Sequence, residues 1–110
     1  MATEAALESF AKRLSEAKAL GKGSIAFRLS GPESGQYFLD CSKGVAKLVK
    51  GTPPHHPIIE LIGDAARIVA ILEGKKDARA QFLVGGFRIR GDLRYASDLA
   101  LELGIIQDPL

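Results

Sequence analysis

Histidine and cysteine are the side chains of this sequence whose spacing is most easily tested for chemistry. His55 and His56 are adjacent in a proline-rich stretch, where two neighbours cannot face one metal as an i, i+4 pair on a helix can. No third ligand is evident, so we interpret the pair as part of a solvated loop. Cys41 is the only cysteine, which excludes an intramolecular disulfide and a four-thiolate metal site. Because no His or Lys stands next to Cys41 to activate its thiol, we expect a small buried hydrophobic residue.

Motifs of catalysis and nucleotide binding are missing from the sequence. It contains no nucleophile elbow and no metal-ligand spacing. The stretch 21–24 (GKGS) lacks the spacing of a phosphate-binding loop. A buried pair of carboxylates is left open by sequence alone. We expect no enzymatic activity and no cofactor.

Basic residues allow two interpretations. The candidates are Arg28, Lys75, Lys76, Arg79, Arg88, Arg90 and Arg94. They are either a solvated surface or a patch that meets anionic lipid headgroups, membrane surfaces or the phosphates of an acyl-CoA. We select Arg88, Arg90 and Arg94 as headgroup or membrane contacts. A net charge of +2 and scattered aromatic residues do not support a nucleic-acid partner.

Length and composition indicate one small domain over residues 1–110. Hydrophobic residues make up 46% of the chain and charged residues 25%, as is ordinary for a globular protein. No apolar run approaches the ~18 residues that a membrane span requires. The acidic start, residues 1–9, lacks the layout of a signal peptide. We therefore expect a cytoplasmic protein.

The hydrophobic periodicity changes several times between a helical and an alternating pattern. It predicts a helix over 3–20, strands over 24–29, 36–41, 45–50 and 58–62, helices over 65–73 and 75–83, a strand over 87–90, and a last helix that ends at Gly104. Thr3, Asp64 and Asp92 are expected as N-caps, and the first three strands, joined by tight turns, as an antiparallel meander. The order predicts an α+β fold with a mostly antiparallel, five-stranded sheet covered on one face by helices.

The segment 74–99 resembles a known family. It contains Gly74, Phe82-Leu83, the stretch 86–92 (GFRIRGD), Ala96 and Leu99. This arrangement is similar to the closing signature of sterol carrier protein type-2 domains, and the order of the upstream elements also matches. The chain ends in Asp108-Pro109-Leu110 and not in a peroxisomal signal, so the peroxisomal setting of animal members does not carry over.

The resemblance implies an apolar tunnel between sheet and helices that holds a small apolar lipid without transforming it. Sterols, fatty acids, acyl-CoAs, phospholipids and isoprenoids all remain open as ligands. The residues expected to line the tunnel are Phe27, Leu29, Tyr37, Leu39, Leu61, Ile68, Leu72, Phe82, Phe87, Ile89, Leu99 and Leu103. The apolar tail after Gly104, including Pro109 and Leu110, is expected to plug the tunnel, to line it or simply to dock on the core.

Two alternatives stay open beside free lipid transfer. The inward-facing apolar residues can simply pack together at the density of an ordinary core. The chain can also be an accessory module that binds a partner enzyme and presents a hydrophobic substrate to it, such as a quinone precursor.

Overall fold

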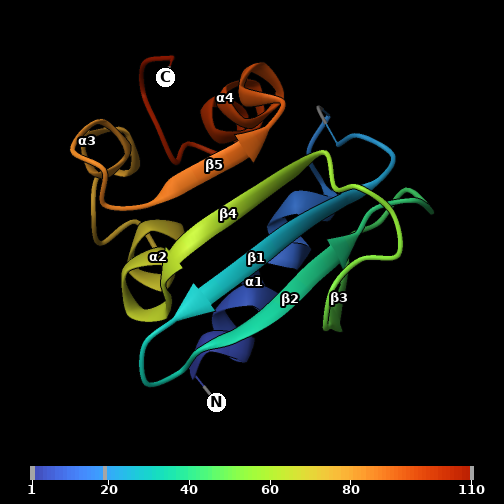
Figure 1. Cartoon of the computed structure of the whole chain (residues 1–110). Coiled ribbons are helices and arrows are strands. Elements are labelled where there is room, and N and C mark those ends of the chain that lie inside the picture. Colours follow the sequence, from blue (N-terminus) through green and yellow to red (C-terminus); the bar gives the residue numbers. More distant parts are fainter. Residues whose placement is uncertain (1, 19, 110) are drawn as a thin grey trace.

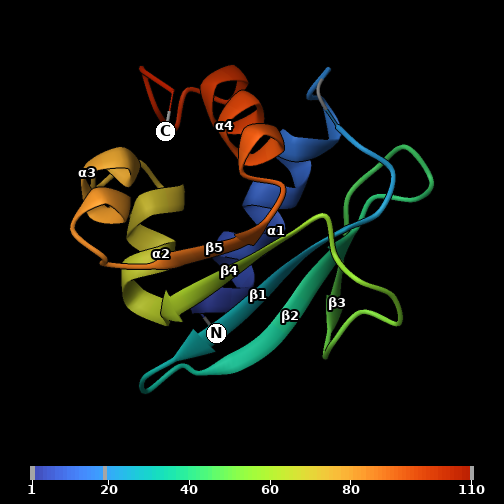
Figure 2. The same ribbon diagram turned by 45° about the horizontal axis from the view of Figure 1, so that its top comes forward.

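A five-stranded sheet forms one layer of the molecule, and the helices form the other (Figures 1 and 2). The computed structural model describes residues 2–18 and 20–109. In chain order the elements are α1 (Ala2–Ser15), β1 (Ser24–Ser30), β2 (Gly35–Asp40), β3 (Lys47–Lys50), β4 (Ile59–Asp64), α2 (Ala65–Leu72), α3 (Ala78–Leu83), β5 (Arg88–Gly91) and α4 (Leu93–Glu102). Among the described residues, no helix combines the length and hydrophobicity that crossing a bilayer requires.

The strands lie in the order β3-β2-β1-β4-β5. β1, β2 and β3 form the predicted antiparallel meander, because short turns join them. The longer connection through the proline-rich loop brings β4 to the other side of β1, where the two strands run parallel. β5 then pairs antiparallel with β4. The expected α+β fold and mostly antiparallel sheet are confirmed.

Alternation along the strands sends apolar side chains to the face that the helices cover (Figure 2). Ile25 lies between Leu39 of β2 and Ile59 of β4, and the side chains of all three are buried. The next inward residue, Phe27, is also buried. The predicted inward face of β1 is therefore confirmed.

Aspartate caps begin α2, α3 and α4. The Asp64 carboxylate accepts a hydrogen bond from the Arg67 amide at 3.1 Å, and Asp92 accepts one from the Tyr95 amide at 3.0 Å. Both satisfy amides that have no partner inside the helix. These two predicted caps are confirmed.

Two predicted helices differ from the structure. Thr3 does not cap α1, because the helix begins at Ala2 and the Thr3 side chain is buried within its first turn. The helix ends at Ser15, before the predicted 20, and position 19 lies outside the described residues. There the Ser15 hydroxyl donates to the carbonyl of Ala11 at 2.8 Å and accepts from the amide of Ala46 at 2.8 Å. This bridge ties the end of α1 to the start of the β3 region.

The helix predicted over 75–83 begins only at Ala78. Asp77 caps this helix by accepting a hydrogen bond from the Ala80 amide at 3.0 Å, so the helix begins three residues later than predicted. The preceding residues form the turn from α2. The third strand likewise begins at Lys47 and not at the predicted position 45.

Candidate functional site

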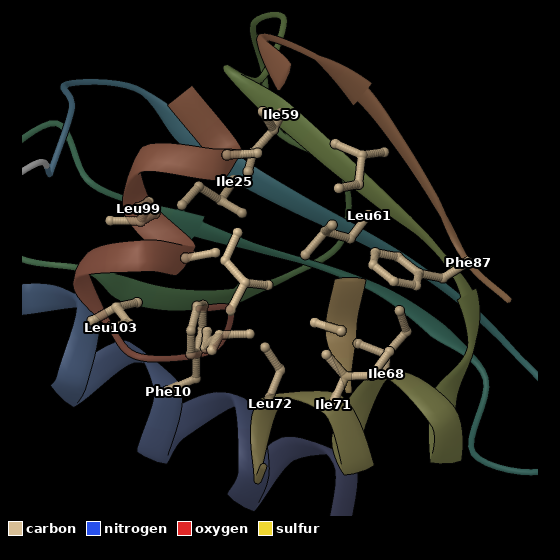
Figure 3. A pocket seen from close by; sticks show the side chains of 16 residues that line it. Phe10, Ile25, Ile59, Leu61, Ile68, Ile71, Leu72, Phe87, Leu99 and Leu103 are labelled. Carbon is tan, nitrogen blue, oxygen red and sulfur yellow. The ribbon is translucent and has the colours of Figure 1, made fainter. Parts of the chain in front are cut away.

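An apolar cavity lies between the helices and the β1-β4-β5 half of the sheet (Figure 3). Its volume is about 70 Å³. Side chains from the strands and from the helices point toward one another across it (Figure 3). The lining residues are Phe10, Ile25, Ile59, Leu61, Ile68, Ile71, Leu72, Ala78, Phe87, Ile89, Ala96, Leu99, Ala100, Leu103, Ile105 and Ile106.

Two helices contribute through regular apolar stripes. On α2, Ile68, Ile71 and Leu72 follow the i, i+3, i+4 spacing of one helical face. On α4, Ala96 and Leu99 have the same spacing. Both stripes therefore face the sheet, while the opposite faces of the helices meet solvent.

The chemistry of this cavity is limited to apolar contact. Every lining side chain is a hydrocarbon, so none can transfer a proton, attack an electrophile or ligate a metal. Pockets for small ligands usually measure about 300–1,000 Å³, so at 70 Å³ the cavity must widen to admit a long chain. Such a site favours a flexible apolar chain that can exchange contacts with movable side chains.

The structure separates the residues predicted to line a tunnel into two groups. Those that line the cavity are Leu61, Ile68, Leu72, Phe87, Ile89, Leu99 and Leu103. Those that lie outside its lining are Phe27, Leu29, Tyr37, Leu39 and Phe82. The first four of the second group belong to β1 and β2, where α1 packs against the sheet.

Phe10 divides the cavity from that second part of the core. Its ring meets the ring of Phe27 edge to face, with centroids 6.4 Å apart and planes at 89°. Phe10 lines the cavity and Phe27 does not. The spacing of Phe10 on its helix identified an inward residue, but only the placement of α1 across the sheet shows which space it borders.

Tyr37 contacts α1 and does not line the cavity. Its side chain is buried, and its hydroxyl donates to the Glu4 carboxylate of α1 at 3.3 Å. Burial and the nearby Glu4 charge raise the pKa of Tyr37 above its ordinary value. This contact belongs to the α1–sheet packing. The Phe82 ring, in contrast, packs at a tilt against the ring of Phe87, with centroids 5.8 Å apart. It therefore supports a residue of the cavity wall without lining the cavity itself.

Arg13 joins the helices around the cavity and was missed by sequence reasoning. Its guanidinium donates to the carbonyl of Leu72 at 3.2 Å and to that of Leu103 at 2.7 Å. These carbonyls lie at the C-terminal ends of α2 and α4, where partners within the helix are missing and a cation is favoured. The available signal was a basic residue in the last turn of α1, which is too common to point to this role.

The comparison with protein families decides what kind of domain this is. The model of the SCP-2 sterol transfer family matches residues 4–101. The chain belongs to this family. The resemblance seen in the segment 74–99 is thereby confirmed and extends over most of the sequence.

Two kinds of relative accompany this match. "Hydroxysteroid dehydrogenase-like protein 2" of Xenopus tropicalis is 32% identical over 89 residues, which are 81% of this chain and 21% of that protein. This chain thus spans about a fifth of that relative's length.

The solution structure of palmitated SCP2L2 from Aedes aegypti has a TM-score of 0.73 and 18% identity, covering 94% of this chain and 95% of that one. The "UbiJ-SCP2 Ubiquinone synthesis protein" has a TM-score of 0.68 and 13% identity, with 94% and 93% covered. The structures show a shared SCP-2 fold.

Within this SCP-2 domain, the basic residues do not form one patch. Arg88 and Arg90 alternate with the inward Ile89 on β5 and are exposed, on the sheet face that the helices leave uncovered. Arg28 joins them there and pairs with Glu60 at 3.3 Å. Arg94 is exposed on α4. None of these arginines lines the cavity.

Lys75, Lys76 and Arg79 gather elsewhere, in a groove between α3 and the residues that follow α4. This group lies on the helical side of the SCP-2 domain, close to the cavity.

The predicted roles of Cys41 and the histidines fit their surroundings. Cys41 is 1% exposed, and burial raises the pKa of its thiol from 9.0 to about 11. The expectation of a small buried residue is confirmed. His55 and His56 are exposed in the proline-rich loop. Among the described residues, no group of three His, Cys, Asp or Glu side chains could hold a metal.

Proposed function

We propose that this domain binds one apolar lipid chain in the cavity between sheet and helices, without catalysis, and transfers or presents it. The observation that carries the proposal is a cavity in the core whose lining is wholly hydrocarbon. The cytoplasmic setting expected from the sequence is part of the same proposal.

Energetics support a chain of ordinary lipid length. A dozen buried methylenes contribute on the order of 10 kcal/mol at ~0.8 kcal/mol each. Association costs of about 4 kcal/mol or more leave at most about 6 kcal/mol, which corresponds to a dissociation constant of tens of micromolar before the cost of widening the cavity. No charged anchor is needed for this affinity.

The neighbours also support a lipid. One described above is palmitated, and a second solution structure, of Sterol Carrier Protein-2 from Aedes aegypti in complex with the C16 fatty acid palmitate, has a TM-score of 0.71 and 19% identity over 96% of this chain and 94% of that one. At this identity the likeness concerns the fold, so the ligand is our proposal. We place fatty acids first among the lipid classes.

A second candidate function is presentation of a hydrophobic substrate to a partner enzyme. It is favoured by the length of the Xenopus relative, in which the matched part is 21% of a dehydrogenase-like protein. A neighbour described as a ubiquinone synthesis protein fits the same idea. A free carrier exchanges its ligand with vesicles alone, whereas a presenting module co-purifies with its enzyme.

Transient contact with anionic membranes is proposed for Arg88, Arg90 and Arg94. Each basic residue near such a surface contributes about 1 kcal/mol. Reversing the charge of Arg88 and Arg90 should therefore weaken co-sedimentation with vesicles that contain phosphatidylserine by more than tenfold. Unchanged vesicle binding would remove these residues from the proposal.

Filling the cavity tests lipid binding. Ala96 is buried and lines the cavity, so Ala96→Leu should occupy the space that a lipid chain needs. We expect at least a tenfold loss of affinity for a fluorescent fatty acid, with unfolding free energy unchanged or about 1 kcal/mol higher, since an empty cavity costs about 24 cal/mol per Å³.

The matched control is Ala66→Leu, on the exposed face of α2. It should leave fatty-acid affinity unaltered. If Ala96→Leu is stable and binds fatty acid as tightly as this control, the lipid does not occupy the cavity and the proposal fails.

A further inference from the structure

Only a thin wall separates the cavity from an outer groove. Ile105 and Ile106 line both spaces. The outer groove lies between α3 with its preceding turn and the C-terminal segment, residues 104–109, and has a volume of about 480 Å³. Figures 1 and 2 show this end of the chain beside α3 and α4. Displacing the two isoleucines joins the groove to the cavity.

The C-terminal segment is held at a few points. The amides of Ile105 and Ile106 donate to the carbonyl of Ala100 at 2.9 and 3.3 Å. Farther along, the Nε of Arg79 donates to the carbonyl of Pro109 at 3.0 Å. Arg79 thus fastens the segment across the groove through a neutral acceptor.

Three cations and two carboxylates line the outer groove. The cations are Lys75, Lys76 and Arg79, and the carboxylates are Asp77 and Asp108. Lys75 pairs with Glu73 at 3.3 Å, and the Asp77 carboxylate caps α3 by accepting a hydrogen bond from the Ala80 amide at 3.0 Å. Asp108 belongs to the C-terminal segment itself, so its charge leaves the groove when that segment moves.

We propose that the lipid is a single-chain anion, a long-chain carboxylate, whose charged end binds Arg79 beside Lys75 and Lys76 while its chain passes Ile105 and Ile106 into the cavity. The carboxylate takes the place of the Pro109 carbonyl as the acceptor at Arg79. This inference rests on the proposed function and adds the residues that hold the charged end of the ligand and the side of the domain at which the ligand enters.

The chemistry at Arg79 favours this exchange. A guanidinium presents parallel N–H groups that match the two oxygens of a carboxylate. Such a charge-assisted pair is roughly twice as strong as a bond to a neutral acceptor. A neutral lipid such as a sterol or an alcohol offers no anion to the three cations, so it gains no preference over the Pro109 carbonyl.

The test compares dodecanoate with dodecan-1-ol, which share the same chain and differ in charge. Both are titrated against the full chain by displacement of a fluorescent fatty acid. We expect the protein to prefer dodecanoate by about tenfold, the effect of one charge-assisted pair. Arg79→Gln should reduce that ratio to near one without weakening dodecan-1-ol, and Arg79→Lys should restore part of it.

Arg67→Gln is the control, since it removes the same group from an exposed position that lines neither space. The double variant Lys75→Gln/Lys76→Gln repeats the test without touching the bond to Pro109, and should lower the ratio several-fold. Each variant is checked by thermal unfolding.

The outcomes separate the two proposals. Equal affinity of the wild type for both ligands overturns the anionic anchor and leaves lipid binding intact. A preference for dodecanoate that survives both Arg79→Gln and the double lysine variant places the carboxylate elsewhere and also overturns it. Failure of both ligands to bind removes the proposed function, and this inference with it.

Discussion

The two faces of the sheet share one backbone and differ in almost everything else. On the helical face, Ile25 and Phe27 of β1 are 1% exposed and meet only apolar neighbours. Between them and beyond, Ala26 and Arg28 point to the other face, where Arg28 pairs with Glu60. Arg28 thus meets a charged surface one residue beyond the buried Phe27, whereas Ala26 on the same face as Arg28 is only 4% exposed.

The covered face of the sheet offers apolar contacts to a ligand, whereas the uncovered face offers charged side chains. The covered face provides a cavity with no polar atom on its lining side chains. The uncovered face carries arginines that can meet anionic surfaces without reaching the cavity. Under the proposed function, the arginines that would meet a membrane and the residues that line the cavity lie on different faces, so substitutions can alter one set without the other.

The largest difference in stability should come from replacing each of two adjacent residues of β1 by alanine. Phe27→Ala removes a ring from the core that also supports Phe10, and should cost about 3–5 kcal/mol of unfolding free energy. Arg28→Ala, one residue along, should cost at most about 1 kcal/mol because its ion pair is on the surface. Urea denaturation measures both. Similar costs for the two variants would contradict the division between the faces.

Asp40 and Cys41, at the end of β2, should make the stability of the domain depend on pH. Burial raises the pKa of Cys41 from 9.0 to about 11, so the folded state disfavours the thiolate that the unfolded chain forms above pH 9. Stability should be fully present below pH 9 and be lost as pH rises toward 11, by roughly 2–3 kcal/mol. Cys41→Ala should flatten this decline between pH 8.5 and 10.

The pKa of Asp40 is shifted in the opposite direction to that of Cys41. Hydrogen bonds from Ser42 lower the pKa of this carboxyl, so its contribution is present above the unfolded value and disappears as pH falls below it. Asp40→Asn should flatten the acid limb of the stability curve and change the alkaline limb less than Cys41→Ala does, because the Asp40 charge is the smaller cause of the raised Cys41 pKa, after burial. An alkaline limb that responds equally to both substitutions would show that the thiol is not its source.

On the helical side, replacing Arg13 tests the hydrogen bonds that join α1 to the ends of α2 and α4. Arg13→Gln removes a cation that serves the C-terminal carbonyls of α2 and α4, and should cost about 1–2 kcal/mol. The control Lys12→Gln alters an exposed neighbour on the same turn of α1 and should cost less than about 0.5 kcal/mol. Equal effects would mean that the two carbonyl contacts contribute little in solution.

The smallest effect is expected on the uncovered face. A double-mutant cycle of Arg28→Ala and Glu60→Ala should give a coupling energy of about 0.2–1 kcal/mol that falls with added salt. A coupling above about 2 kcal/mol would indicate that this face is buried against a partner.

The sequence was sufficient for what depends on local pattern. Alternation identified the inward residues of β1, and Asp64 and Asp92 identified two helix starts, because a capping carboxylate acts within three residues. The end of α1 was mispredicted because Ser15 is held by Ala46, which is distant in sequence. Local periodicity contains no information about such a contact.

The same reason limits the prediction of the site. Leu61 of β4 and Tyr37 of β2 both lie on the inward face of the sheet, on either side of β1, but only Leu61 borders the cavity. The difference arises because α1 packs against β1 and β2, and this placement follows from tertiary packing. The sequence also grouped Arg79 with Arg88 as one basic set, whereas the fold places them on opposite sides of the sheet layer.

Lipid binding in the cavity is best tested by native mass spectrometry of the purified chain, followed by organic extraction of whatever is bound. We expect a complex with one lipid per chain, and extraction should yield a single-chain carboxylate. A ligand-free mass that stays unchanged after incubation with fatty acids, together with no thermal shift, would show that the core is simply packed and that the cavity binds no lipid.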